Sequence, residues 1–423
     1  MNPDPRAAAV KVSAMRRRRA LTHVGGEVSV AGNREIGAKL ARALDVAPPS
    51  MTGTDEADRE HVHGFHAYPA RLHPTTAARL IETLASARAT VLDPFCGSGT
   101  LLVEAMLAGR RAIGTDLNPL AVRLSRLKTA CHDPRELDAI VRAARAVAKI
   151  ADERRTRRAG ATHRFPPDDV ALFDPHVLLE LDSLRAGILE ESRDMPEVQS
   201  ALELVLSAIL IKVSRQAADS STAQVKKRIM PGLPARLFAS KAEELARRIT
   251  AFAAKLPSGA LPAAVALDDA LRLKTVLASS VDVVITSPPY AATHDYVAHH
   301  AARMRWLGLD GRPFEAHEIG SRRRYAELAA HEVRAEWTRE LSRMLKSLAR
   351  ACRPGGKLAL ILGDSAVHGE ALRADAIVAS VAPSCGLGLV ARASQRRPHF
   401  HAPSAPAFER TPRSEHVIVL SKG

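Results

Sequence analysis

The chain has 423 residues, of which 46% are hydrophobic and 25% charged, a composition typical of a globular protein with a sizeable core. The longest apolar stretch, residues 201–213, is too short to cross a bilayer, and the N-terminus lacks an apolar signal segment, so we expect a cytoplasmic protein. The net charge of +15 favours a polyanionic partner such as nucleic acid, whereas four scattered cysteines without a C-x-x-C pair predict neither a metal site nor disulfides.

The first part of the chain divides into an arm and a strand–helix–strand unit. Residues 1–60 lack sustained periodicity and contain proline, glycine and charge, which predicts a partly ordered basic arm. Residues 89–93 then form a predicted strand, 100–108 a helix and 111–116 a second strand. This order is that of a βαβ unit, and it therefore predicts a parallel sheet.

Residues 131–259 have a different pattern, in which apolar residues recur at helical spacing. Leu137, Ile140 and Val147, for example, fall on one face of a predicted helix. We interpret this section as a helical insert and a possible target-recognition region. Its basic loop supplies the candidate nucleic-acid-binding residues Lys226, Lys227 and Arg228.

Strand signals return after the insert, at residues 263–267, 281–286, 357–362, 387–391 and 416–420, with a long helix at about 331–352. With the first two strands, this makes a seven-stranded sheet. The sequence therefore predicts an α/β catalytic domain formed by residues 61–130 and 260–423, interrupted by the helical insert.

A glycine-rich turn follows the first predicted strand. Gly97 and Gly99 allow positive φ and a close approach of the backbone to a ligand, and the N-terminus of the next helix offers unpaired N–H groups. Asp116, at the end of the second strand, is placed to accept both hydroxyls of a ribose. The turn and the acid together predict a nucleoside-bearing cofactor. A tight turn with a capping aspartate is the structural alternative.

The strand at 281–286 leads directly into Ser287-Pro288-Pro289-Tyr290. Open α/β sheets bind ligands at such strand ends, and two prolines remove two N–H donors, which leaves rigid carbonyl acceptors. Such acceptors suit methyl transfer to an aromatic amine, which is a poor nucleophile because its lone pair is delocalised into the ring. The Ser287 hydroxyl and the Pro288 carbonyl could accept hydrogen bonds from the two N–H groups of the amine, which would favour a pyramidal nitrogen. Tyr290 would stack on the aromatic ring that carries the amine, such as a nucleic-acid base. A plain polyproline turn is the alternative.

Both stretches resemble motifs of the amino-group DNA methyltransferases. Asp93 to Thr100 is similar to their D-P-F-x-G-S-G-T loop, and residues 287–290 to their [D/N/S]-P-P-[Y/F] tetrad. The resemblance implies a Rossmann-like class I methyltransferase fold and S-adenosylmethionine as cofactor, with Asp269, or its neighbour Asp268, near the adenine. The implied cofactor-binding residues are Tyr68, Pro69, Asp93, Phe95, Gly97, Ser98, Gly99, Thr100, Asp116 and Asp269.

The same resemblance suggests the substrate. Serine in the first tetrad position is commoner among enzymes that methylate N(4) of cytosine in DNA than among those that methylate N(6) of adenine. RNA guanine-N(2) and adenine-N(6) methyltransferases share similar motifs and remain an alternative, as does an inactive nucleic-acid-binding protein. Carbon-5 methylation of cytosine is disfavoured, because no Pro-Cys pair follows the strand. Arg322, Arg323 and Arg324 form a candidate phosphate-binding edge or a solvated basic face.

Two features depart from the family pattern. The local sequence around Asp93 resembles enzymes in which the tetrad comes first, whereas here the glycine loop precedes it. The insert at 131–259 has no counterpart in the family pattern. Target specificity therefore does not follow from the resemblance.

Overall fold

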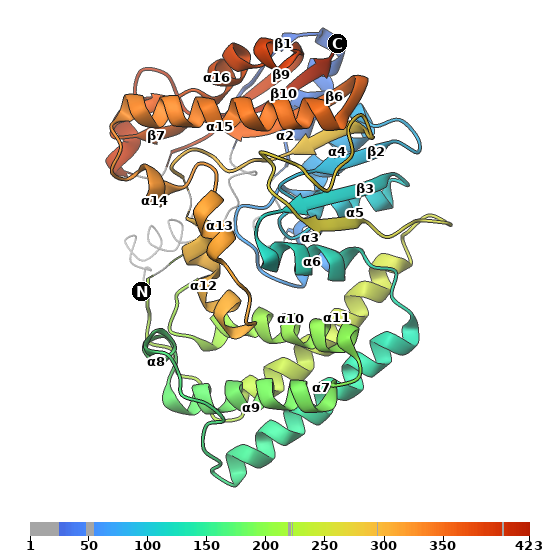
Figure 1. Ribbon diagram of the computed structural model, residues 1–423, viewed down its shortest axis with the longest axis vertical. Helices are drawn as coiled ribbons and strands as arrows, with labels where there is room; N and C mark the ends of the chain where they lie inside the picture. Colours follow the sequence, from blue (N-terminus) through green and yellow to red (C-terminus); the bar gives the residue numbers. More distant parts are fainter. Residues whose placement is uncertain (1–24, 48–54, 219–220, 222, 294, 400–401) are drawn as a thin grey trace, which may run out of the picture.

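The computed structural model of the protein describes residues 25–47, 55–218, 221, 223–293, 295–399 and 402–423 (Figure 1). Its centre is an eight-stranded sheet in which the strands follow the order β1-β9-β10-β6-β5-β2-β3-β4. These strands are β1 (Val28–Gly32), β2 (Thr90–Asp93), β3 (Arg111–Asp116), β4 (Ala264–Leu267), β5 (Val281–Thr286), β6 (Cys352–Gly363), β9 (Leu387–Arg396) and β10 (Ser414–Lys422).

The strand directions are those of a Rossmann-like class I methyltransferase. The strands β4, β3, β2, β5 and β6 run parallel to one another, whereas β10 is antiparallel to both of its neighbours, β6 and β9. All seven predicted strands are present, and the predicted fold class is confirmed. The sheet order reverses between β2 and β5, and ligands bind at such a switch point in open α/β sheets.

The strand β1 is an eighth strand that the sequence pattern did not predict. It lies in the region assigned to the N-terminal arm and pairs with β9, residues 28–32 opposite 391–395. The helix α2 (Arg34–Leu44) follows it and buries Leu40 and Leu44. Five residues of strand are too few for their alternation to stand out from a loop. Residues 1–24 and 48–54 of the predicted arm lie outside the described residues.

Helices cover both faces of the sheet, so central strands such as β2 and β5 are buried on both sides, whereas the edge strands β1 and β4 are more exposed. In β5, Val283 and Ile285 belong to one apolar cluster, and Val284 between them belongs to the other. Such burial on both faces explains why the strand is a continuous apolar run. The first cluster includes α2, α4 (Pro74–Leu84), α5 (Thr100–Leu107) and α6 (Pro119–Thr129), and the second includes α15 (Ala330–Ala351) and α16 (Ala374–Val381).

The helical insert lies between α6 and β4, at the end of the molecule opposite β1 and β9 (Figure 1). In α7, Leu137, Ile140 and Val147 are buried on one face, as their spacing predicts. The apolar core of the insert is continuous with that of the sheet face beside it. Its helices are α7 (Pro134–Thr156), α8 (Pro167–Leu172), α9 (Pro175–Glu191), α10 (Pro196–Val213) and α11 (Leu233–Ala253).

Three further helices follow β5: α12 (Tyr296–Trp306), α13 (Arg312–His317) and α14 (Arg322–Tyr325). We call α12 and α13 the cover helices, because residues from them and from the loop after α13 line the cavity of the candidate site. The remaining elements are α3 (Glu56–Arg59), η2 (His61–Gly64), the hairpin β7 (Ser365–Val367) and β8 (Glu370–Leu372), η3 (Pro383–Cys385) and η4 (Ala402–Phe408). In the described part of the chain, no helix combines the length and the apolar character needed to span a membrane.

Candidate active site

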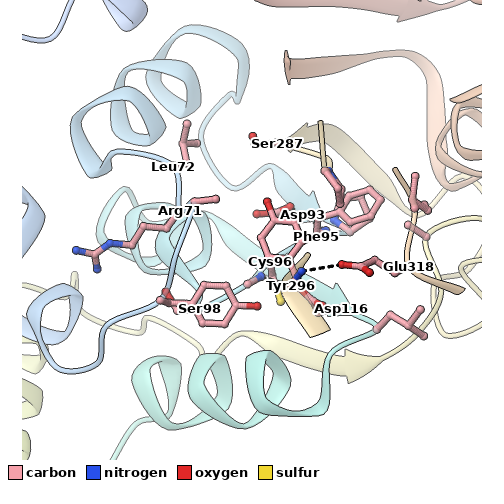
Figure 2. A pocket seen from close by; sticks show the side chains of 18 of the residues that line it. Arg71, Leu72, Asp93, Phe95, Cys96, Ser98, Asp116, Ser287, Tyr296 and Glu318 are labelled. Carbon is pink, nitrogen blue, oxygen red and sulfur yellow. Dashed lines mark hydrogen bonds between the residues drawn. The ribbon is translucent and has the colours of Figure 1, made fainter. Parts of the chain in front are cut away.

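Three adjacent parallel strands end in polar residues at one edge of the sheet. The strand β2 ends at Asp93, β3 at Asp116 and β5 at Thr286. Carboxyl ends of parallel strands meet at one edge, and a cavity opens there (Figure 2). The predicted site residues that line this cavity are Tyr68, Pro69, Asp93, Phe95, Gly97, Ser98, Thr100, Asp116, Asp269, Ser287 and Pro289.

The glycine loop has the backbone conformation that its composition predicts. Gly97 and Gly99 adopt φ of +50° and +84°, and Gly99 is the N-cap residue of α5. A Cβ atom on Gly99 would lie 3.0 Å from the Ser125 hydroxyl oxygen, and one on Gly97 would lie 3.3 Å from the Tyr68 ring. Conformation and space therefore both favour glycine at these two positions.

Asp116 connects this loop to the start of α6. Its Oδ2 accepts a hydrogen bond from the Gly97 N–H at 2.8 Å, and its Oδ1 accepts one from the Asn118 N–H at 2.9 Å. Burial raises the pKa of the Asp116 carboxyl to about 6. Each carboxylate oxygen has a second lone pair, so the group can still accept hydroxyl donors of a ligand.

Two buried hydroxyl groups of the loop have no hydrogen-bond partner among the described residues. They are Ser98 Oγ and Thr100 Oγ1, in side chains that are 1% and 4% exposed. Buried hydroxyls are nearly always hydrogen-bonded in folded proteins. Because both residues line the cavity, they suit the polar groups of a ligand such as the amino-acid part of S-adenosylmethionine.

The segment before the glycine loop is fixed from two sides at Tyr68. The Tyr68 hydroxyl accepts a hydrogen bond from Asn118 Nδ2 at 3.2 Å, and its ring stacks on His300 of α12 with 4.7 Å between centroids. Arg71 also lines the cavity, but its guanidinium points away (Figure 2) and donates to Asp58 Oδ2 at 2.6 Å. Tyr68 therefore faces the cavity, whereas the charge of Arg71 does not.

The structure distinguishes the two candidate acids after β4. Asp268 is turned into its own loop, where its Oδ2 accepts the Thr275 N–H and hydroxyl, both at 2.7 Å. Asp269 lines the cavity, although its Oδ1 also accepts the Leu271 N–H of the same loop at 2.9 Å. Its position is consistent with the preference for Asp269 as the cofactor-binding acid.

A hydrogen bond joins the glycine loop to the tetrad. The Thr286 hydroxyl donates to Asp93 Oδ1 at 2.7 Å, and the Phe95 N–H donates to the same oxygen at 3.1 Å. Burial raises the pKa of the Asp93 carboxyl to about 7. The two sequence motifs are therefore one structural unit at the switch point of the sheet.

The four tetrad residues do not all face the same space. Ser287 and Pro289 line the cavity, whereas Pro288 is buried and neither it nor Tyr290 is a lining residue. The Tyr290 hydroxyl donates to Glu415 Oε1 at 2.9 Å. Tyr290 is thus placed beside the cavity and not inside it.

The cover helices and the loop after them contribute two cavity residues that were not among the predicted site residues. Tyr296 and Glu318 face the cavity (Figure 2), and the Tyr296 N–H donates to Glu318 Oε1 at 2.9 Å. Glu318 is 2% exposed, its Oε2 has no hydrogen-bond partner among the described residues, and burial raises its pKa. Tyr296 lies in residues 291–308, which the sequence pattern after the tetrad predicts to be a loop and helix over the site, whereas Glu318 neither ends a strand nor belongs to a recognisable motif.

The predicted phosphate-binding residues are only partly free to meet a partner. Arg324 donates to Glu340 Oε1 at 3.1 Å, Arg323 to Glu315 Oε1 at 2.5 Å, and Lys227 to the Ile211 carbonyl at 2.8 Å. Three of the predicted phosphate-binding residues are exposed and form no ion pair among the described residues: Arg322, Lys226 and Arg228.

Two side-chain groups elsewhere contain metal-ligand residue types. In the first, His63 Nε2 is 2.7 Å from Glu104 Oε1, while the Nδ1 atoms of His61 and His63 have no partner among the described residues. Histidines that bind metals normally donate their second nitrogen to a neighbour. We therefore assign no metal to this group. The second group consists of Asp364, Asp375 and His416; both of its carboxylates form ion pairs with arginines, and we assign no metal to it either.

Comparisons with known proteins find similarity to several methyltransferases. Residues 47–126 match a family model described as DNA methylase. The Type II methyltransferase M.MvaI from Kocuria varians is 39% identical over 82 residues, which cover 19% of this chain and 18% of that protein. The Type II methyltransferase M.BsoBI from Geobacillus stearothermophilus is 21% identical over 412 residues, which cover 77% of this chain and 79% of that protein.

The match to M.MvaI thus spans less than a fifth of the length of that relative. Among solved structures, the rRNA methyltransferase aviRa from Streptomyces viridochromogenes has 18% identity and a TM-score of 0.32, covering 88% of this chain and 94% of that chain. A TM-score this low supports no inference about function. Over residues 47–126, which include the glycine loop and Asp116, the chain is similar to DNA methylases, and this match implies S-adenosylmethionine as the methyl donor.

Proposed function

We propose that this protein transfers a methyl group from S-adenosylmethionine to an exocyclic amino nitrogen of a base in DNA, with N(4) of cytosine as the preferred acceptor. The main support is one observation: Ser287 and Pro289 of the tetrad line the same cavity as the glycine loop and Asp116. In this proposal the methyl-donor site and the strand end that binds the amine are adjacent, as direct transfer requires.

The residues of the cavity suit a positively charged cofactor. Asp93, Asp116, Asp269 and Glu318 all line it, and the guanidinium of Arg71 points away from it (Figure 2). When bound, S-adenosylmethionine supplies an electrophilic methyl group on a sulfonium centre. In our proposal the unpartnered hydroxyls of the glycine loop and Asp116 hold its amino-acid and ribose parts, and Asp269 contacts its adenine.

The tetrad orients the amine. We assign the Ser287 hydroxyl and the Pro288 carbonyl as acceptors of the two amino N–H groups, which turns the nitrogen lone pair towards the methyl group. The hydrogen bond from Thr286 to Asp93 fixes this strand end against the glycine loop. Tyr290 stacks on the base, which must first be flipped out of a duplex.

DNA is preferred over RNA because the two relatives reported above are named Type II methyltransferases and the matching family model is described as DNA methylase. Cytosine is preferred because the first tetrad position is Ser287 and not aspartate or asparagine.

The test uses tritiated S-adenosylmethionine with separate DNA and RNA pools, followed by mass spectrometry of the digested nucleosides. We expect N(4)-methylcytosine from DNA. N(6)-methyladenine in DNA would contradict the assignment of cytosine as the acceptor base but would support amino-group methylation of DNA. Methylation of RNA alone would contradict the assignment of DNA as the substrate. Cofactor binding by calorimetry without transfer to any pool would contradict the proposed reaction.

A further inference from the structure

Tyr290 is held in place by residues from the last third of the chain. Its hydroxyl donates to Glu415 Oε1 at 2.9 Å, and the other oxygen of that carboxylate, Oε2, accepts from Arg397 Nε at 2.9 Å. A Cβ atom added to Gly363 would lie 2.7 Å from the Tyr290 ring. The ring is therefore confined on one side by the backbone of β6, and its hydroxyl is confined by Glu415.

The sheet topology explains how these residues meet. Because β10 is antiparallel to β6, its first residues lie at the edge where β5 and β6 end. Glu415 is the second residue of β10, and it stands opposite Gly363 in the ladder. A residue 125 positions after Tyr290 in the chain therefore reaches the strand end that carries the tetrad.

Burial makes the arginine an anchor for the carboxylate. The Arg397 side chain is only 1% exposed, and that of Glu415 is 21% exposed. A buried guanidinium is costly without an anionic partner, so Arg397 holds Glu415 in one orientation. One carboxylate oxygen is then used by the arginine, and the other is presented to the tyrosine hydroxyl.

We propose that Glu415, held by Arg397, is a positioning residue that sets the orientation of the Tyr290 ring for the flipped base. This inference rests on the proposed function, in which Tyr290 stacks on the acceptor base. Glu415 acts through the tyrosine and not on the cofactor, because it is absent from the lining of the cofactor cavity. Its removal should therefore reduce kcat and leave the affinity for S-adenosylmethionine unchanged.

A double-mutant cycle tests this assignment, with Glu415→Ala, Tyr290→Phe and the double variant compared in steady-state methyl transfer well below the unfolding temperature. We expect Glu415→Ala to lower kcat about tenfold, since a small misplacement of a reacting partner is costly. In the Tyr290→Phe background, the same change should lower kcat less than about twofold, because the hydroxyl that links the two residues is already gone. An equal loss in both backgrounds would overturn the proposal.

Asp375→Ala is the matched control. Asp375 is also about one-fifth exposed and paired with an arginine, Arg392 of β9; among the described residues its ion pairs join it to Arg392 and His416 and not to Tyr290. It should leave kcat unchanged. Glu415→Gln keeps an acceptor oxygen, so its decrease in kcat should be smaller than that of Glu415→Ala. The glutamine variant can replace the alanine variant in these measurements if the alanine variant folds poorly.

A second readout does not depend on activity. The chain has four tyrosines, so 3-fluorotyrosine labelling gives a simple ¹⁹F NMR spectrum in which Tyr290→Phe identifies one resonance. We expect Glu415→Ala to shift that resonance and Asp375→Ala to leave it in place; an unmoved resonance in Glu415→Ala would overturn the proposal. A shifted resonance in a protein that methylates no nucleic acid would contradict the proposed function while supporting the contact.

Discussion

Asp93 is the residue at which the glycine loop and the strand end before the tetrad meet. One oxygen of its carboxylate accepts hydrogen bonds from the Thr286 hydroxyl and the Phe95 N–H, and the group is buried. Burial disfavours the charged form and raises its pKa to about 7. The Asp93 carboxyl is therefore half protonated near neutral pH, which makes its contribution to stability depend on pH.

This pKa predicts the sign of a pH effect. Because the folded-state pKa is above that of the unfolded chain, the folded protein binds more protons between about pH 4 and 7. Asp93 therefore stabilises the fold less as pH rises through this window. Denaturant titrations at several pH values would give the free energy of unfolding of the wild type and of Asp93→Asn. We expect the value for Asp93→Asn minus that for the wild type to increase from pH 4 to 7 and then to level off. A difference that falls with pH would contradict the assignment.

Ser287→Ala tests the role of the hydroxyl at the reaction centre. We expect kcat to fall roughly tenfold to a hundredfold, because one preorganised acceptor of the amine is lost, while cofactor affinity stays near normal. Ser280→Ala, just before the start of the same strand, is the control, since the one hydrogen bond of its hydroxyl among the described residues goes to the Leu277 carbonyl. Full activity of Ser287→Ala on every nucleic-acid substrate would show that the centre is wrongly placed.

The neighbouring acids Asp268 and Asp269 form a matched pair. Asp269→Ala should weaken S-adenosylmethionine binding about tenfold, the scale expected for a lost hydrogen bond to a charged group. Asp268→Ala should instead lower the free energy of unfolding by about 1 kcal/mol or more, because Thr275 and the Asp269 N–H lose their acceptor. Calorimetry and thermal melts separate these outcomes, and the reverse pattern would exchange the two roles.

At the scale of elements, the buried strands were the most predictable part of the fold. The strands β3 and β5 begin and end where the sequence pattern places them, because both faces are buried and their apolar runs are sharply bounded. The strand β1 was missed because its five residues become a strand only by pairing with β9, far along the chain. Likewise, the glycine loop and the tetrad were recognisable as motifs, whereas Glu318 and Glu415 reach the site through tertiary packing.

The cover helices provide a prediction at this scale. Residues of α12, α13 and the loop after α13 line the cavity opposite the glycine loop. Bound S-adenosylmethionine should therefore slow hydrogen exchange in residues 295–320 as well as in 95–101, as measured by mass spectrometry. Protection confined to the glycine loop and β3 would show that the cover helices do not close over the cofactor.

At the scale of the whole molecule, the net charge of +15 is the feature most relevant to a polyanionic partner. Part of that charge is used internally, since Arg324 supports the buried carboxylate of Glu340. Arg322, in contrast, is exposed and has no ion pair among the described residues. The two arginines are therefore expected to respond differently to substitution, although they are two positions apart.

We expect Arg322→Ala to reduce the salt dependence of DNA binding by about one unit of slope, the effect of one phosphate contact. Arg324→Ala should mainly lower the melting temperature, because it removes a partner of a carboxylate that is 4% exposed. Binding titrations at several salt concentrations measure the first effect. An unchanged slope for Arg322→Ala would identify that side chain as ordinary surface.

The pairing of β3 with β4 has a consequence for how such a chain can change over time. The two strands lie side by side, with Asp116 opposite Leu267, although the whole helical insert separates them in sequence. Asp116 and the loop that holds Asp269 are thus kept together by a backbone ladder and not by the insert. Selection can therefore lengthen, shorten or remodel the insert while the spacing between the two carboxylates is inherited unchanged.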